Sequence, residues 1–206
     1  MQYAIVSDKG LREHNEDSVG CKVIGDRAVF VVADGLGGHD KGEVASAMAV
    51  DTFLRIFEDE YNPNDYISKS MQTAQQEILT AQETVPANAN MKTTVVCIVI
   101  DGDRYKYANV GDSRLYVVDR VADSERVARL TKDHSVPQLL VETGEIDERE
   151  IRFHPDRNRL LRALGSEMRE NFWNESEWQS LENVEGFLLC SDGLWEGVMD
   201  IERTTG

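Results

Sequence analysis

The sequence predicts an α+β fold in which sheets stack on one another and helices lie outside them. Two long helical patterns, each with one apolar stripe, have short apolar runs before and after them. Residues 93–100 form a run that is almost wholly apolar and rich in β-branched side chains. Such a run is typical of a strand covered on both faces. A layered fold with a sheet-on-sheet interior provides that cover.

Length and charge place the chain among ordinary globular proteins. It has 206 residues, with 22 Lys and Arg against 38 Asp and Glu, and a formal net charge of −16. This length predicts a single domain, 1–206. The negative charge argues against nucleic acid and against anionic membrane surfaces, because both attract Lys and Arg.

The N-terminus and the cysteines favour a cytoplasmic protein. No basic start followed by an apolar run is present, so we expect no signal peptide. The longest apolar run, 95–100, is too short to cross a bilayer. Cys21, Cys97 and Cys190 are widely separated, which predicts neither a disulfide framework nor a zinc site.

The first half of the chain predicts strands followed by two helices. The expected strands are residues 2–6, 18–24 and 28–33. A turn at Gly25-Asp26 joins the last two. Residues 42–60 predict a helix, and Asn64 or Asp65 could cap a second one. In that second helix, apolar side chains recur at steps of three and four and keep one stripe buried.

The second half predicts further strands and one irregular segment. The expected strands are residues 93–100, 104–110, 114–118, 126–130 and 186–190. Between residues 133 and 164 the pattern is short, helical and charged. This stretch therefore predicts no regular sheet.

Three aspartates follow apolar runs, each beside a glycine. They stand in the pairs Asp34-Gly35, Gly111-Asp112 and Asp192-Gly193. One such pair taken alone is most simply a turn. Three carboxylates brought together from strand ends would form a negative, oxygen-rich pocket that suits Mg²⁺ or Mn²⁺. Spacing alone does not show that they converge.

An N-terminal loop adds a candidate phosphate-binding group. Residues 12–17 read Arg-Glu-His-Asn-Glu-Asp, which in isolation is most simply a solvated loop. The Arg12 guanidinium could bind two phosphate oxygens at once. Glu16 and Asp17 could orient water bound to a metal ion.

Motif counts argue against several enzyme classes. Residues 35–42 lack the Gly-Lys-Ser/Thr of a Walker loop and the third glycine of a dinucleotide fingerprint, and no Gly-x-Ser-x-Gly elbow occurs. Cys21 and Arg27 match the spacing of thiol phosphatases. However, the residues between them are typical of a strand and turn rather than a phosphate-binding loop. The four histidines show no metal-ligand spacing.

Five motifs, in order, resemble the protein phosphatase 2C family of metal-dependent Ser/Thr protein phosphatases in its bacterial form. They are Arg12-x-x-Asn15-Glu16-Asp17, Val-Ala-Asp-Gly-Leu-Gly-Gly-His at 32–39, Gly-Asp-Ser-Arg-Leu-Tyr at 111–116, Leu-Thr-x-Asp-His-Ser at 130–135 and Leu-Cys-Ser-Asp-Gly-Leu at 189–194. The match covers nearly the whole chain. It implies a β-sandwich of two antiparallel sheets flanked by helices, in four layers, α/β/β/α.

The resemblance also implies a set of metal ligands. Asp34 would bridge two Mn²⁺ or Mg²⁺ ions, and the Gly35 carbonyl would ligate one of them. Asp192 would hold the other ion. Asp112 is similar to the ligand of a third, weaker ion.

Further roles follow from the same resemblance. Arg12 would hold the phosphate and act with Asp34 in catalysis, while Glu16 and Asp17 would orient bound waters. Residues 133–152 are similar to a flap that borders the substrate in bacterial members.

The implied activity is hydrolysis of phosphoserine and phosphothreonine in proteins by a water activated between two divalent metals. The implied substrate is a phosphoprotein of a bacterial Ser/Thr kinase system. Family members usually carry a further strand with an Asp-Asn-x-Thr/Ser motif, which the sequence to Gly206 does not contain. A second hypothesis therefore stays open, in which the chain is a weak or inactive pseudophosphatase that binds phosphoproteins or regulates a partner.

Overall fold

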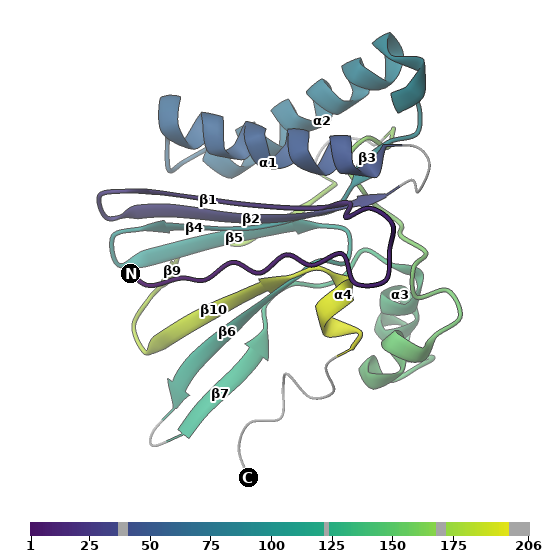
Figure 1. The fold of residues 1–206 in the computed structure, drawn as a ribbon. Helices are drawn as coiled ribbons and strands as arrows, with labels where there is room; N and C mark the ends of the chain where they lie inside the picture. The colour runs from purple at the N-terminus through teal and green to yellow at the C-terminus, as the bar shows by residue number, and fades with distance from the viewer. Residues whose placement is uncertain (37–40, 122–123, 168–171, 198–206) are drawn as a thin grey trace.

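Two antiparallel sheets and two pairs of helices make up the fold in the computed structural model, which describes residues 1–36, 41–121, 124–167 and 172–197 (Figure 1). Helices α1 (Gly42–Asp59) and α2 (Tyr66–Thr84) lie side by side on the outer face of the larger sheet. The smaller sheet lies against the other face. The predicted α+β sandwich is confirmed.

The larger sheet has seven strands among the described residues. They are β1 (Asp17–Ile24), β2 (Arg27–Leu36), β3 (Lys92–Thr93), β4 (Val95–Asp101), β5 (Arg104–Val110), β8 (Asn174–Glu175) and β9 (Gln179–Ser180). The main path runs β1-β2-β4-β5-β8, with β3 paired to β2 and β9 to β5. β4 is central and buried over nearly its whole length, as the apolar run predicts.

The smaller sheet and the two remaining described α-helices come from the second half of the chain. Its strands, in the order β10-β6-β7, are β6 (Arg114–Val121), β7 (Ser124–Arg129) and β10 (Val184–Cys190). The other helices are α3 (Val136–Glu142), α4 (Asp192–Trp195) and the 3₁₀ turns η2 (Pro86–Asn88) and η3 (Glu148–Phe153). We call residues 133–153 the α3–η3 segment.

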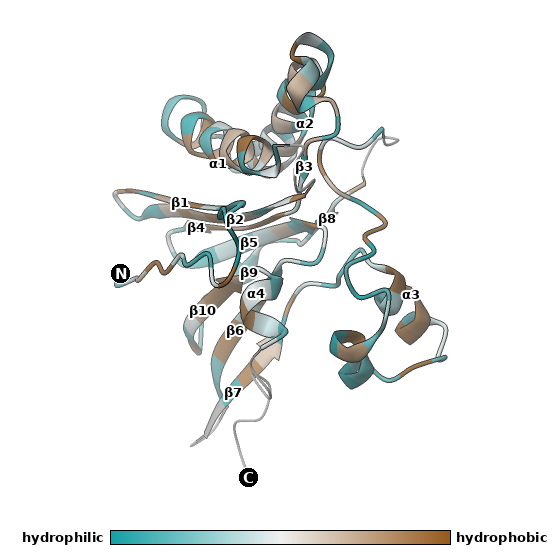
Figure 2. Cartoon of the chain, turned by 45° about the vertical axis from the view of Figure 1, so that its right-hand side comes forward, coloured by the Kyte–Doolittle hydropathy of each residue, from teal (hydrophilic) through white to brown (hydrophobic). Residues whose placement is uncertain are grey.

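Apolar side chains fill the space between the layers. Phe53, Met71 and Ile78 of α1 and α2 are fully buried against the larger sheet. Hydrophobic residues run along β6 and β10 (Figure 2). Because side chains alternate along a strand, Leu115 of β6 points between the sheets, whereas Tyr116 points outward. There Tyr116 packs in a third cluster with residues of η3 and α4, so helical segments flank both sheets.

The antiparallel topology gathers several strand ends at one edge of the sandwich. Asp17 at the start of β1 pairs with Asp34 near the end of β2. Val110 ends β5 opposite the start of β4, and Cys190 ends β10 opposite Arg114, which begins β6. The end of β2 with Asp34-Gly35, the β5–β6 turn with Gly111-Asp112 and the start of α4 with Asp192-Gly193 therefore lie at this edge, where α3 also lies (Figure 1).

Two strand predictions need correction. Residues 2–6 form no strand in the described chain: they are exposed, and only Tyr3 makes a ring contact, edge-on to Phe30 with 5.4 Å between the ring centroids. The run 93–100 is interrupted at Thr94, whose N–H donates to the Asp34 carbonyl at 2.8 Å. The short β8, β9 and α4 carry too few residues for a periodic pattern and were not predicted.

Phe53→Ala should lower the free energy of unfolding by about 3–5 kcal/mol, because it removes a fully buried ring and leaves a cavity. Urea denaturation measures the change. Phe153→Ala is the matched control: that ring is 72% exposed, so its loss should cost less than about 1 kcal/mol. Equal losses for the two variants would contradict the described core.

Candidate active site

Asp34 and Asp17 form the centre of the strand-end edge. They lie opposite each other on β2 and β1, and opposed residues of an antiparallel pair project to the same face. The Ser191 hydroxyl donates to Asp17 Oδ2 at 2.7 Å. This bond draws the start of α4, and with it Asp192, toward the Asp17–Asp34 pair.

The main chain of Asp34 is fixed on both sides by two threonines. Its N–H donates to Thr94 Oγ1 at 3.0 Å, and its carbonyl accepts from the Thr93 hydroxyl at 2.9 Å and from the Thr94 N–H. The side chain of Asp34 is only 4% exposed. The three bonds hold the main chain of a buried aspartate in one place. The sequence signal for Thr93 and Thr94 is a pair of hydroxyl residues next to an apolar strand.

Gly35 is required by close packing of main chain. A Cβ built at this position would lie 2.3 Å from the Gly42 carbonyl oxygen and 2.7 Å from that of Glu16. The Gly35 N–H donates to the same Glu16 carbonyl at 3.0 Å. Any other residue would therefore push the first turn of α1 away from the edge.

Asp112 reaches the edge from the β5–β6 turn. Gly111 before it has φ +96, and a Cβ there would lie 2.5 Å from Thr94 Cγ2. The Asp112 side chain is buried, and its main-chain carbonyl accepts from the Trp195 indole N–H at 3.0 Å. No motif in the sequence indicates this role for Trp195.

Burial and neighbouring carboxylates raise the pKa of two aspartates at this edge. Burial, followed by the charges of Asp192, Asp17 and Asp112 and a hydrogen bond with Asp192, raises the pKa of Asp34 to about 9. Burial, with the charges of Asp133 and Asp192, raises the pKa of Asp112 to about 8. Both groups therefore keep a proton at neutral pH when no cation is near.

This donor set fits hard divalent cations. Mg²⁺ and Mn²⁺ favour carboxylate oxygens, and a bound cation would replace the protons that the crowded acids retain. In the described chain, no three His, Cys, Asp or Glu side chains stand as a ready-made metal cage. The charges of the aspartates affect one another, but their carboxylates do not surround a single position that a metal ion could occupy.

The other predicted residues lie at or near this edge. Arg12 is exposed, with 59% of its side chain accessible, and its Nη1 lies 4.0 Å from Glu16 Oε2. The Glu16 side chain is 13% exposed. Residues 37–39 of the second motif and the last residues, 204–206, lie outside the described chain. Among the described histidines, His134 is buried and hydrogen-bonded, with Nδ1 accepting from the Gly111 N–H at 3.2 Å.

The thiol alternative finds no support in the geometry. Cys21 lies within β1, paired with Phe30, and Arg27 begins β2. The intervening residues form a strand and a tight hairpin turn, as the sequence predicts. Such a hairpin does not present the main-chain N–H groups that a phosphate-binding loop at a helix start would offer.

Comparison with known proteins identifies the family. A family model for protein phosphatase 2C matches residues 10–204. The chain belongs to the protein phosphatase 2C family. The Serine/threonine phosphatase stp of Listeria innocua is 34% identical over 208 residues, which span 95% of this chain and 79% of that protein. The Serine/threonine protein phosphatase PstP of Mycobacterium tuberculosis is 35% identical over 204 residues, 97% of this chain and 37% of that protein.

Solved protein phosphatase 2C structures share the same fold. The serine/threonine phosphatase Stp1 from Staphylococcus aureus superposes with a TM-score of 0.83 at 31% identity, covering 94% of this chain and 76% of that one. The catalytic domain of PstP in complex with 2 manganese ions superposes with a TM-score of 0.76 at 31% identity, covering 97% and 80%. Among the described helices, none is both long and apolar enough to span a membrane.

In EDTA, the free energy of unfolding should fall as the pH rises from 5 to 8.5. An acid whose pKa rises from 3.8 when unfolded to about 9 when folded binds more protons in the folded state, so stability is lost across that interval. Asp34→Asn should flatten this profile. It should also raise the melting temperature at pH 8 by at least about 3 °C, or about 1 kcal/mol for a chain of this size.

Asp51→Asn removes an exposed aspartate of α1 and controls for the change in net charge. It should leave the pH profile as in the wild type. A wild-type stability that rises steadily from pH 5 to 8.5 would contradict the crowding of the carboxylates.

Proposed function

We propose that the chain hydrolyses phosphoserine and phosphothreonine esters in proteins. The observation that carries the proposal is the strand-end edge, where Asp34 lies opposite Asp17, Ser191 bonds to Asp17 beside Asp192, and burial and nearby carboxylates raise the pKa of Asp34 and Asp112. Its support from comparison is the similarity to Ser/Thr phosphatases along 95% of the chain. That similarity does not favour the alternative of an inactive pseudophosphatase.

A divalent metal is the cofactor that these residues suit. We propose Mn²⁺ or Mg²⁺, two ions held by Asp34, the Gly35 carbonyl and Asp192, and a third held by Asp112. The PstP structure with 2 manganese ions supports this assignment. When bound, the ions supply positive charge at the phosphate and lower the pKa of a water that attacks it.

The chain's own side chains position substrate and water. Arg12 is exposed beside Glu16, where its guanidinium can reach a phosphate in solvent and bind two oxygens. Glu16, close to Arg12, and Asp17, fixed by Ser191, can accept hydrogen bonds from the attacking water and orient it. Because the net charge of −16 repels a phosphoester at long range, local positive charge is needed to reverse the field at this edge.

The substrate and setting follow from the same proposal. We propose residues 1–206 as one catalytic domain, with 133–152 as a flap beside the site. The substrate would be a phosphorylated protein of a bacterial Ser/Thr kinase system. The three cysteines are all free thiols, which supports a reducing cytoplasm.

Phosphate release from a phosphothreonine peptide should require added Mn²⁺ and stop in EDTA. Asp34→Asn should lower kcat at least about 10³-fold, because it removes the carboxylate proposed to hold both ions. Asp51→Asn and Cys21→Ser are the controls and should keep wild-type rates. Release that is independent of metal and lost in Cys21→Ser would instead establish the thiol mechanism.

Arg12→Ala should lower kcat/KM for the same peptide about 10- to 100-fold, because one charge-assisted phosphate contact is lost. Arg12→Lys should recover only part of it, since an ammonium cannot bind two oxygens in a fork. Arg55→Ala removes an arginine paired with Glu77 on the helical layer and should not change the kinetics. Arg12→Ala with wild-type kcat/KM would remove Arg12 from the site.

A further inference from the structure

Trp195 lies where three parts of the site meet. It ends α4, the helix that begins with Asp192, and it is 1% exposed. Its indole N–H, which can only donate, bonds to the Asp112 carbonyl at 3.0 Å. One buried hydrogen bond therefore links the element that carries Asp192 to the turn that carries Asp112.

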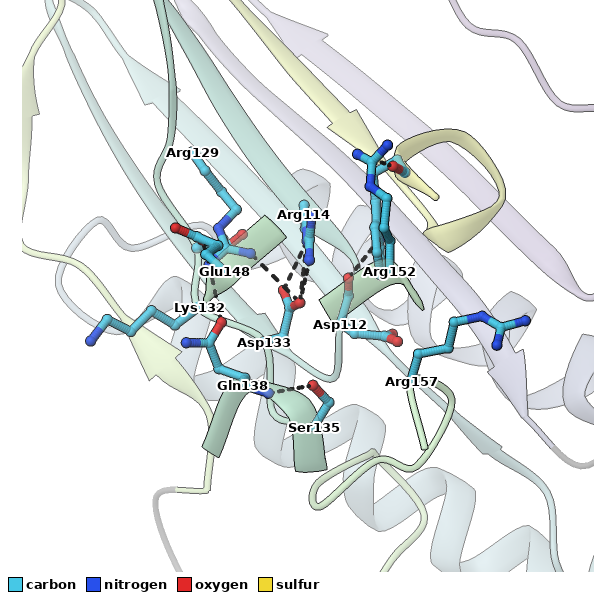
Figure 3. Close-up of polar contacts among 12 residues, drawn as sticks. Asp112, Arg114, Arg129, Lys132, Asp133, Ser135, Gln138, Glu148, Arg152 and Arg157 are labelled. Carbon is cyan, nitrogen blue, oxygen red and sulfur yellow. Dashed lines mark hydrogen bonds and ion pairs between the residues drawn. The ribbon is translucent and has the colours of Figure 1, made fainter. Parts of the chain in front are cut away.

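The face of the Trp195 ring is occupied by a buried charge pair. The Arg114 guanidinium carbon lies 3.5 Å from the ring centroid, a cation–π contact. Arg114 in turn donates to both oxygens of Asp133, from Nη2 at 2.6 Å and from Nε at 3.1 and 3.2 Å (Figure 3). Asp133 is the first residue of the α3–η3 segment. The pair therefore connects the ring to the start of that segment.

The far end of the α3–η3 segment also contacts Trp195. Arg152 Nη2 donates to the Trp195 carbonyl at 3.2 Å, and Ile151, 2% exposed, packs with the ring in the outer cluster. Arg129 forms ion pairs with both ends of the segment: its Nη1 lies 3.6 Å from Asp133 Oδ2, and its Nη2 pairs with Glu148 (Figure 3). Local opening of the segment must break these contacts.

We propose that Trp195 is a positioning residue that joins Asp112, α4 and the α3–η3 segment, so that a divalent cation bound by the carboxylates also stabilises the segment. The inference rests on the proposed cation site. Cations bound at Asp192 and at Asp112 hold both ends of the hydrogen bond that the Trp195 indole makes between α4 and the Asp112 turn. The free energy needed to open the segment then includes the loss of cation binding as well as the loss of the contacts of Arg152 and Ile151.

Hydrogen exchange of the full chain, with and without Mn²⁺ and without substrate, tests the coupling. In the wild type, Mn²⁺ should slow exchange in Val136–Glu142 and Glu148–Phe153 about tenfold. Trp195→Phe keeps an aromatic ring, although a smaller one, and loses the indole N–H, so this slowing should fall below about threefold while α2 exchanges as in the wild type. Calorimetry should show Mn²⁺ binding about three- to tenfold weaker, the effect of one buried hydrogen bond.

Two further variants complete the test. Trp173→Phe is the matched control, because it also loses an indole hydrogen bond, 3.1 Å to Glu175, but at β8; it should respond to Mn²⁺ as the wild type does. Arg152→Ala should lose the slowing in the segment while Mn²⁺ affinity stays within about threefold. If Trp195→Phe does not fold, Arg152→Ala tests the coupling between the cation and the α3–η3 segment.

The outcomes separate this inference from the function on which it rests. Mn²⁺ binding that leaves the segment unchanged in the wild type, or that slows it equally in Trp195→Phe, overturns the coupling and leaves the phosphatase intact. No Mn²⁺ binding to the wild type at all overturns the cation site, and the coupling with it.

Discussion

Carboxylates gathered at one edge of a sandwich repel one another, and the rest of the structure has to hold them there. Asp34 sits on a strand whose register with β1 and β4 is fixed over most of its length, and Thr93 and Thr94 bind its main chain. The buried side chains of β4 anchor that register. A soft scaffold would relax the crowding by moving the acids apart, whereas a close-packed sheet interior does not yield.

The same edge also shows how charge can be buried without such crowding. Arg114 and Asp133 neutralise each other through paired hydrogen bonds, so their burial leaves no strong excess of either sign. Among the described residues, no basic side chain forms an ion pair with Asp34 or Asp112, and both keep protons instead. The edge therefore holds two kinds of buried acid: one neutralised by an arginine, and one protonated, which in the proposed function exchanges its proton for a cation.

A residue's role could be predicted from the sequence where neighbouring residues determine it. It could not be predicted where contacts between distant parts of the chain determine it. The apolar run of β4 carries its own signal and correctly predicted a covered strand. The aspartates after apolar runs predicted a cation site, which stays a prediction. Whether those aspartates converge depends on strand order, which no spacing reveals. Trp195 is indistinguishable in sequence from a core residue, because its hydrogen-bond partner, Asp112, is 83 positions away.

The buried carboxylates that the proposed function needs lower the stability of the fold. Each buried acid whose pKa is raised makes the fold less stable at neutral pH, and the core beneath α1 and α2 has to offset that cost. A bound cation reverses the sign, because a ligand that binds only the folded state adds to its stability. If the carboxylates hold a metal as proposed, its binding returns the free energy given up in burying and crowding them. For this reason the elements tied to Asp112 and Asp192, α4 above all, are the ones whose order should depend on the ion.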